Sequence, residues 1–280
     1  MILDDFDSRP GSAPSLLRTV IGSYLRELGG WISVSELIRL MGALGVSPQQ
    51  TRTAVTRVKG KGVLVSEQVN GVRGYRLADD AIPMLENGDR RIFSFRQQED
   101  GGEWCLVSFS LPETARATRH QLRRRLEWIG CGTVTTGLWI GPAFLAEEVE
   151  RILADLDIRD HATVFITKTP QTAESLPHAV AQWWDLERIA QLHRAFLNDA
   201  AGFANRDGGN SPELAFSGYI RTLDSWRTIP YLDPGLQPRA LPEDWPGVAS
   251  VALFQHIRRD LGPAASAFVS PEARQPLVRS

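Results

Sequence analysis

The stretch 47–62 constrains the fold most, because it combines a complete helix-start signal with two faces of opposite character. Ser47 is a favourable N-cap and Pro48 suits the first helical position. Gln50 stands three residues after Ser47, which makes a capping box. At helical spacing one face of the predicted helix is small or apolar and carries Thr51, Ala54, Val55 and Val58. The opposite face is polar and basic and carries Gln49, Arg52, Thr53, Thr56 and Arg57. Such a face can enter a DNA major groove, although most polar helix faces are only solvated.

Two further helices are predicted before this stretch. The first has an apolar stripe at 3.6-residue spacing and ends at Gly29-Gly30; the stripe consists of Leu17, Val20, Ile21, Tyr24, Leu25 and Leu28. Trp31–Ser33 could form one short strand. Ser33 or Ser35 then caps a second helix, with Leu37, Ile38, Met41 and Leu44 facing inward. Gly45-Val46 makes a tight connection into the Ser47 helix, which gives the order of a helix-turn-helix.

A β-hairpin is predicted directly after these helices. The β-rich runs 63–69 and 72–77 flank Asn70-Gly71, the strongest short-range hairpin signal. A hairpin in this place is the wing of a winged helix, and Arg73 near its tip could reach a phosphate or a minor groove. The alternative is a small core-forming hairpin with a solvated tip.

Charge supports an interaction with DNA. Residues 47–77 contain six Arg or Lys and one acidic residue, a net charge of +5. The whole chain carries −2, so the remaining residues carry −7. A basic island on an acidic chain is typical of a DNA-binding domain.

Composition excludes several other classes. No run of about 18 apolar residues occurs, so we expect no membrane span. Residues 1–9 are acidic and lack the apolar run of a secretory signal, which favours a cytoplasmic, nucleoid-associated protein. Cys105 and Cys131 lie in strand-like runs and are expected to be buried thiols. The five histidines are scattered, so no metal site is expected.

The middle of the chain predicts a β-α-β-β-α-β order. Strands are expected at 104–110, 133–134, 138–140 and 163–167, and helices at 112–129 and 145–156. This order is that of the ferredoxin-like split βαβ unit.

The remainder is predicted to be mostly helical. A connecting helix should run from Asp80 to about Asn87 and end at Gly88. Later helices are expected at 179–196, 212–228 and 248–261, separated by a polar loop at 205–211 and by a proline-rich segment at 230–246 that is either an ordered extended loop or disordered. We therefore predict an α+β protein. Its parts are a flexible terminus (1–14), a winged helix-turn-helix domain (15–78), a linker helix (79–96), a ferredoxin-like domain (97–175) and a C-terminal helical domain (176–280).

Four sequence motifs resemble those of a known family. They are Leu111-Pro112-Glu113 followed by residues 119–130 (RHQLRRRLEWIG); Gly137-Leu138-Trp139-Ile140-Gly141-Pro142; Trp184-Asp185-Leu186; and residues 241–247 (LPEDWPG). With the predicted domain order, they resemble the PaaX-like repressors of phenylacetic acid catabolism over about residues 15–270.

This resemblance implies a transcriptional repressor. Such a protein binds an inverted-repeat operator as a dimer and leaves it on binding an aryl-acyl-CoA, usually phenylacetyl-CoA. The family's middle domain is similar to small CRISPR-associated nucleases that use an acidic residue at the end of their first strand. Here that position reads Ser108-Phe109-Ser110, so we expect no nuclease activity.

Candidate site residues follow from these patterns. For DNA we select a set on the Ser47 helix and the hairpin: Gln49, Gln50, Arg52, Thr53, Thr56, Arg57, Lys59, Lys61 and Arg73. Of these, Arg57, Lys59, Lys61 and Arg73 are expected at phosphates, which position a protein on DNA but do not specify sequence. A CoA ester needs cations for its phosphates and an apolar slot, which suggests Arg116, Arg119, Arg123, Trp183 and Trp184. The alternatives are a solvated or interface helix for the arginines and a core role for the tryptophans.

Two other functional classes compete with the repressor. The chain has no nucleophile elbow, phosphate-binding loop, dinucleotide fingerprint or metal-ligand spacing, so we expect neither an enzyme nor a bound cofactor. A nucleic-acid-binding adaptor without small-molecule control remains an alternative, although the long helical C-terminal part favours a ligand-controlled protein.

Overall fold

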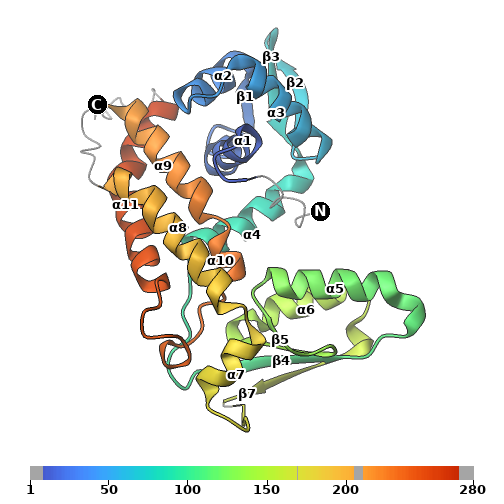
Figure 1. Cartoon of the computed structure of the whole chain (residues 1–280). Coiled ribbons are helices and arrows are strands. Elements are labelled where there is room, and N and C mark those ends of the chain that lie inside the picture. The colour runs from blue at the N-terminus through green and yellow to red at the C-terminus, as the bar shows by residue number, and fades with distance from the viewer. Residues whose placement is uncertain (1–8, 169, 205–210, 271–280) are drawn as a thin grey trace, which may run out of the picture. The chain divides into compact units, whose positions relative to one another are not determined.

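The computed structural model describes residues 9–168, 170–204 and 211–270 (Figure 1). The chain contains helices and two antiparallel sheets, which makes it an α+β protein as predicted. It divides into two compact units. Unit 1 consists of Met1–Arg90, Ala195–Arg227 and Ala249–Ser280, and unit 2 of Arg91–Arg194 and Thr228–Val248. Residues of the segment 176–280, predicted to form one helical domain, thus contribute to both units. The predicted terminus 1–14 and loop 205–211 lie mostly outside the described residues.

Unit 1 begins with the predicted succession of helices. α1 (Ala13–Val20) continues into one π-helical segment, Ile21–Leu25, and β1 (Trp31–Ser33) follows. Ser33, rather than Ser35, caps α2 (Val34–Ala43), because its side chain accepts a hydrogen bond from the Glu36 N–H. α3 (Pro48–Gly60) comes next. The first-helix stripe is buried as predicted except at Leu28, which is half-buried.

The predicted hairpin is confirmed. β2 (Leu64–Val69) and β3 (Val72–Leu77) pair antiparallel along their whole length, and β1 joins the free side of β3. Asn70 and Gly71 turn the chain with φ angles of 49° and 81°, a left-handed conformation that favours these two residue types. A side chain at Gly74 would lie 2.4 Å from the Trp31 ring, so this strand position must be glycine for the indole to pack across it.

Four further helices belong to unit 1 or cross its boundary in the chain. α4 (Ile82–Phe93) follows a short 3₁₀ turn at Asp79–Ala81. α9 (Pro212–Trp226) lies within unit 1, while α8 (Leu186–Ala204) and α11 (Gly247–Val269) are shared between the units. The prediction that the connecting helix ends at Gly88 was wrong. A helical glycine costs only about 1 kcal/mol, and Arg91 beyond it is held by the Ile129 carbonyl and by Glu148. α11 also continues past the predicted end at Leu261 and through Pro263.

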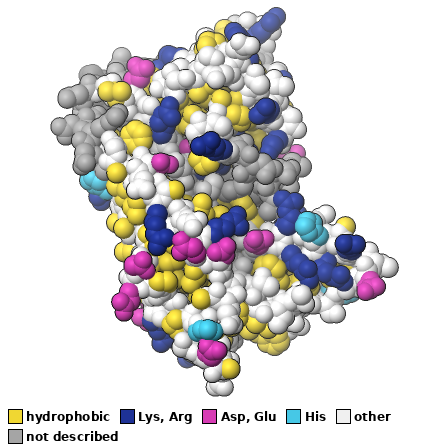
Figure 2. All heavy atoms as spheres, viewed as in Figure 1, with side chains coloured by type: hydrophobic (Ala, Val, Ile, Leu, Met, Phe, Trp, Pro, Cys, Tyr) yellow, Lys and Arg dark blue, Asp and Glu magenta, His cyan; other side chains and the backbone are white. Residues whose placement is uncertain are grey.

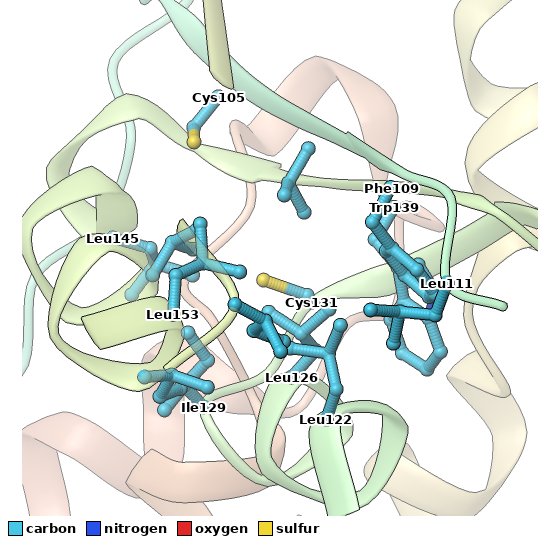
Figure 3. Packing of buried hydrophobic residues seen from close by; sticks show 14 residues of the cluster. Cys105, Phe109, Leu111, Leu122, Leu126, Ile129, Cys131, Trp139, Leu145 and Leu153 are labelled. Carbon is cyan, nitrogen blue, oxygen red and sulfur yellow. The ribbon is translucent and has the colours of Figure 1, made fainter. Parts of the chain in front are cut away.

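Unit 2 is built on a four-stranded antiparallel sheet. The elements follow the predicted β-α-β-β-α-β order: β4 (Trp104–Phe109), α5 (Arg116–Trp128), β5 (Gly132–Thr135), β6 (Leu138–Pro142), α6 (Ala146–Asp155) and β7 (Ala162–Thr167). The order of strands in the sheet is β5-β6-β4-β7. α5 and α6 cover one face, where side chains such as Phe109, Leu122, Leu126 and Leu153 form a buried cluster (Figure 3).

The other face of this sheet carries a second cluster. Trp104 and Ile140 pack there with Val180 of α7 (Leu176–Trp183) and with Leu236. The prediction of one helix over 179–196 was wrong: α7 ends at Trp183, Trp184 is extended, and α8 starts at Leu186. The segment 230–246 is ordered and includes the short helix α10 (Ile229–Leu232) and a 3₁₀ turn at Pro238–Ala240.

The cysteines are buried free thiols, as predicted. Burial raises the pKa of Cys105 from 9.0 to about 11 and raises that of Cys131 still further. Across residues 9–168, 170–204 and 211–270, no group of three or more His, Cys, Asp or Glu side chains is placed to hold a metal ion. Within the same residues, no helix combines the length and apolar character needed to cross a bilayer.

Candidate nucleic-acid interface

The start and the buried face of α3 fix its position. Ser47 Oγ accepts a 3.2 Å hydrogen bond from the Gln50 N–H, and Gln50 Oε1 accepts a 2.9 Å bond from the Ser47 N–H, so the predicted capping box is confirmed. Thr51, Ala54, Val55 and Val58 are each at most 3% exposed, which confirms the predicted inner face. α3 is packed against α1 and α2 through this face. The helix is therefore held as a rigid element.

The opposite face of α3 presents the predicted polar set to solvent. Gln49, Arg52, Thr53, Thr56 and Arg57 are all exposed. Thr53 Oγ1 and Thr56 Oγ1 donate 3.1 Å bonds to the carbonyls of the residues four positions earlier, which limits their rotamers. Gln50 is also exposed, but its carbonyl oxygen is engaged in the capping box. Its side-chain NH2 group therefore remains available for a further hydrogen bond.

The cations of the hairpin and of the end of α3 differ in their partners. Lys59 Nζ donates a 2.6 Å bond to Ser66 Oγ of β2, so it joins the helix to the hairpin. Lys61 is half-buried, whereas Arg73 near the hairpin tip is exposed. Arg76 pairs with Asp79 at 2.7 Å and lies 3.5 Å from Glu67. Arg73 is thus the hairpin arginine best placed for a phosphate.

A buried carboxylate of unit 1 was missed by the sequence prediction. Asp224 of α9 is 1% exposed and accepts 2.7 Å bonds from Ser15 Oγ, Thr19 Oγ1 and the Gly11 N–H. Arg227 Nε lies 3.2 Å from the same carboxylate. Because α1 packs on α3, this network ties the support of α3 to α9. In the sequence Asp224 is one acidic residue in an amphipathic helix, and nothing distinguishes it.

A second arginine is buried close to Asp224. Arg18 of α1 is 8% exposed, and its pKa is lowered from 12.5 to about 10. The main cause is desolvation, followed by repulsion from Arg227, which the attraction of Asp224 only partly opposes. The negative charge of Asp224 therefore attracts two buried guanidinium groups, those of Arg18 and Arg227. This attraction favours the burial of both groups.

The arginines proposed for the effector all lie on α5, where basic side chains gather on the surface (Figure 2). Arg119 donates to the carbonyls of Leu111, at 2.6 Å, and Pro112. Arg123 donates a 3.0 Å bond to the Thr136 carbonyl. Both residues thus hold neighbouring loops, whereas Arg116 is exposed at the start of the helix.

The two tryptophans proposed for the effector have different surroundings. Trp184 is 6% exposed, and its Nε1 donates a 2.8 Å bond to the Gly130 carbonyl. Its ring covers Gly132, where an added Cβ would lie 2.6 Å from it. Trp183 is half-buried and meets Trp184 edge to face. Trp184 is therefore part of the core of unit 2, and Trp183 borders it.

Comparison with known proteins gives matches along most of the chain. Three family models match: "PaaX-like protein" at residues 12–81, "PaaX protein central Cas2-like domain" at 97–179 and "PaaX-like protein C-terminal domain" at 184–271. A relative named "Transcriptional repressor PaaX" from Escherichia coli (strain K12) is 25% identical over 268 residues, which cover 93% of this chain and 84% of the relative. The solved structure of the uncharacterized protein Rv0674 from Mycobacterium tuberculosis shares the fold. Its TM-score is 0.60 at 24% identity, with 92% of this chain and 98% of that chain covered.

These matches define the class and the family. The class is that of transcriptional regulators, not enzymes, in agreement with the sequence prediction. The chain belongs to the PaaX-like family, as its motifs suggested.

Proposed function

We propose that this protein is a DNA-binding transcriptional repressor whose residues 15–78 act as a winged helix-turn-helix. The exposed face of α3 carries the proposal: Gln49, Arg52, Thr53, Thr56 and Arg57 lie together on a helix whose other face is fully packed. Inserted in a major groove, such a helix offers arginine to guanine and glutamine to adenine. The hairpin then serves as the wing, with Arg73 at a phosphate.

The sheet of unit 2 supports a second part of the proposal. Its chain order and its strand order, β5-β6-β4-β7, are those of a ferredoxin-like domain. We assign to the regions outside the winged helix the dimer contact and the response to a ligand. The effector we propose is an aryl-acyl-CoA such as phenylacetyl-CoA, and the regulated genes are those of phenylacetate-type catabolism. The exposed Arg116 is the best placed of the candidate arginines to meet a CoA phosphate.

The DNA proposal is tested by a mobility shift with the DNA that flanks the protein's own gene, at one stated salt concentration. Arg52→Ala and Arg57→Ala should each weaken specific binding by about 1–3 kcal/mol. Arg259→Ala is the matched control, because Arg259 is an exposed arginine of α11. Unchanged affinity of both α3 variants would place the reading helix elsewhere.

The effector is tested in the same assay. Loss of the shift on adding phenylacetyl-CoA, but not on adding free CoA, supports a ligand-controlled repressor. A specific shift that no acyl-CoA changes would instead identify a DNA-binding adaptor.

A further inference from the structure

The turn between α2 and α3 is held by a residue from far along the chain. α2 is capped at Leu44, and Gly45 then turns the chain in a left-handed conformation with a φ angle of 74°. The N–H groups of Gly45 and Val46 bond back to carbonyls of α2, as they commonly do where a helix ends at glycine. The carbonyl of Leu44 instead accepts a 2.5 Å hydrogen bond from Nη2 of Arg221 in α9.

The chemistry of this bond makes it strong for a single contact. Its donor is a charged guanidinium, and such bonds are roughly twice as strong as those between neutral groups. The cation also lies at the C-terminal end of α2, where the helix dipole is negative. Leu44 is 1% exposed, so the loss of Arg221 would leave its carbonyl poorly hydrated and without this donor. The turn therefore depends on Arg221 for its conformation.

Two further contacts join the same helices to the C-terminal part of unit 1. Arg39 of α2 donates a 3.1 Å bond to the Phe268 carbonyl of α11, and its guanidinium carbon lies 4.3 Å from the centre of the Phe268 ring. Asp224 follows Arg221 by one helical turn and bonds to α1. α9 packs against both α1 and α2 (Figure 1). All these residues belong to unit 1, so α9 and α11 are part of the support of the helix-turn-helix.

We propose that Arg221 is a positioning residue for the recognition of DNA sequence. By fixing the turn, Arg221 sets the direction in which α3 leaves it. The proposal rests on the DNA-binding function proposed above and adds a residue that acts on it without touching DNA. In a helix-turn-helix the N-terminal residues of the reading helix contact base edges. Here these are Gln49 and Arg52, at the end of α3 that adjoins the turn, so a shift of the turn displaces them directly.

The proposal predicts that the loss of Arg221 affects sequence selectivity more than general affinity for DNA. Base contacts require α3 in one defined place, whereas phosphate contacts carry no sequence information. An exposed cation such as Arg73 can still meet a phosphate when α3 is displaced. A direct contact of Arg221 with a phosphate would give a different result, because it would strengthen binding to all sequences equally.

The first test compares affinities for the DNA that flanks the protein's own gene and for unrelated DNA, by fluorescence anisotropy of the full chain at one salt concentration. Arg221→Gln should weaken binding to the specific site about tenfold, as the loss of one good base contact does, and binding to unrelated DNA less than about twofold. Arg221→Lys keeps a charged donor and should recover part of the loss. An equal loss on both DNAs, or an unchanged ratio of the two affinities, overturns the proposal.

Arg26→Gln is the matched control for this test. Arg26 is an arginine of unit 1 that also donates to a backbone carbonyl, that of Gly22 at 2.7 Å, and it pairs with Asp89. Its bonds do not involve the turn, so the change should leave the ratio of specific to unrelated affinity as it is in the wild type. A loss of selectivity in this variant too would assign the effect to general destabilisation and overturn the role of Arg221.

The second test asks whether Arg221 acts through α3. Arg221→Gln combined with Arg52→Ala should cost less than the sum of the two single losses, because Arg52 reaches its base only while α3 is in place. Arg221→Gln combined with Arg73→Gln should be additive, since a phosphate contact of the hairpin does not require the turn. Additive losses in both pairs would contradict the proposal.

The third test examines the free protein. Amide hydrogen exchange over residues 45–51 should be faster in Arg221→Gln than in the wild type, with the sheet of unit 2 unchanged. If Arg221→Gln does not fold, the milder Arg221→Lys gives the same comparisons. A wild type that binds no DNA removes the proposed function and the role of Arg221 with it. A selective wild type whose selectivity and exchange both survive the change at Arg221 overturns the positioning role alone.

Discussion

Thr19 and Asp224 are joined by a 2.7 Å hydrogen bond although 205 positions separate them in the chain. The bond belongs to a buried network in which one carboxylate of α9 holds α1, and α1 supports the inner face of α3. The orientation of the proposed DNA-reading helix thus depends on a residue far from it in the sequence.

Asp224→Asn should lower the free energy of unfolding by about 3–5 kcal/mol, because it leaves the buried Arg227 without the carboxylate with which it pairs. Urea denaturation measures this loss. Asp199→Asn, at an exposed position of α8, should change stability by less than about 0.5 kcal/mol. Equal stability of the two variants would show that the network contributes nothing.

Arg73→Gln should weaken DNA binding about equally for specific and unrelated sequences. A phosphate contact releases a counterion, so the slope of log affinity against log salt should become shallower by about one. Fluorescence anisotropy at four or more salt concentrations measures the slope. Arg259→Gln should leave it unchanged, and a loss confined to the specific sequence would identify Arg73 as a base-reading residue instead.

The buried thiols predict a loss of stability at high pH. The folded-state pKa of Cys105 is raised by burial from 9.0 to about 11, and that of Cys131 is raised further. Above about pH 9 the unfolded chain therefore binds fewer protons than the folded protein, so the stability contribution present below pH 9 is lost as pH rises toward 11. Denaturation midpoints from pH 7 to 10.5 measure the loss, which should be smaller in Cys105→Ala/Cys131→Ala. A thiol reagent should label neither cysteine before unfolding at pH 8; rapid labelling of the native protein would contradict their burial.

Gly132→Ala should destabilise unit 2 by about 1–3 kcal/mol, because the new Cβ would lie 2.6 Å from the Trp184 ring and force it to move. Gly42→Ala is the opposite case, a helical position with nothing within 4 Å, and should stabilise by about 0.5–1 kcal/mol. Chemical denaturation followed by near-ultraviolet circular dichroism measures both changes. If Gly132→Ala left the stability unchanged, the Trp184 indole would have to be loosely packed at this position.

The elements predicted correctly depend on short-range signals. The capping box of Ser47 and Gln50 and the turn at Asn70-Gly71 involve residues at most three positions apart, so the sequence alone specifies them. The exposed face of α3 follows from its periodicity in the same way.

The misjudged elements depend on contacts between distant segments. Trp184 interrupts the predicted helix because its indole bonds to Gly130 and packs on Gly132, and no signal near Trp184 reveals these partners. Arg119 and Arg123, which stay predictions for the effector site, hold the carbonyls of Leu111 and Thr136, and the sequence does not reveal these partners. Asp224 was missed for the same reason, since its partners lie about two hundred residues earlier.

The division of the chain has a consequence for the order of events during synthesis. Unit 1 is assembled from residues near both ends of the chain, and α1 lacks its Asp224 anchor until α9 has been made. A ribosome adds about 5–20 residues per second, so the N-terminal helices wait many seconds for their support. A chain that stops early therefore lacks a properly supported α3. The capacity to bind DNA would then mature only on nearly complete molecules, and fragments released by premature termination would not compete for the operator.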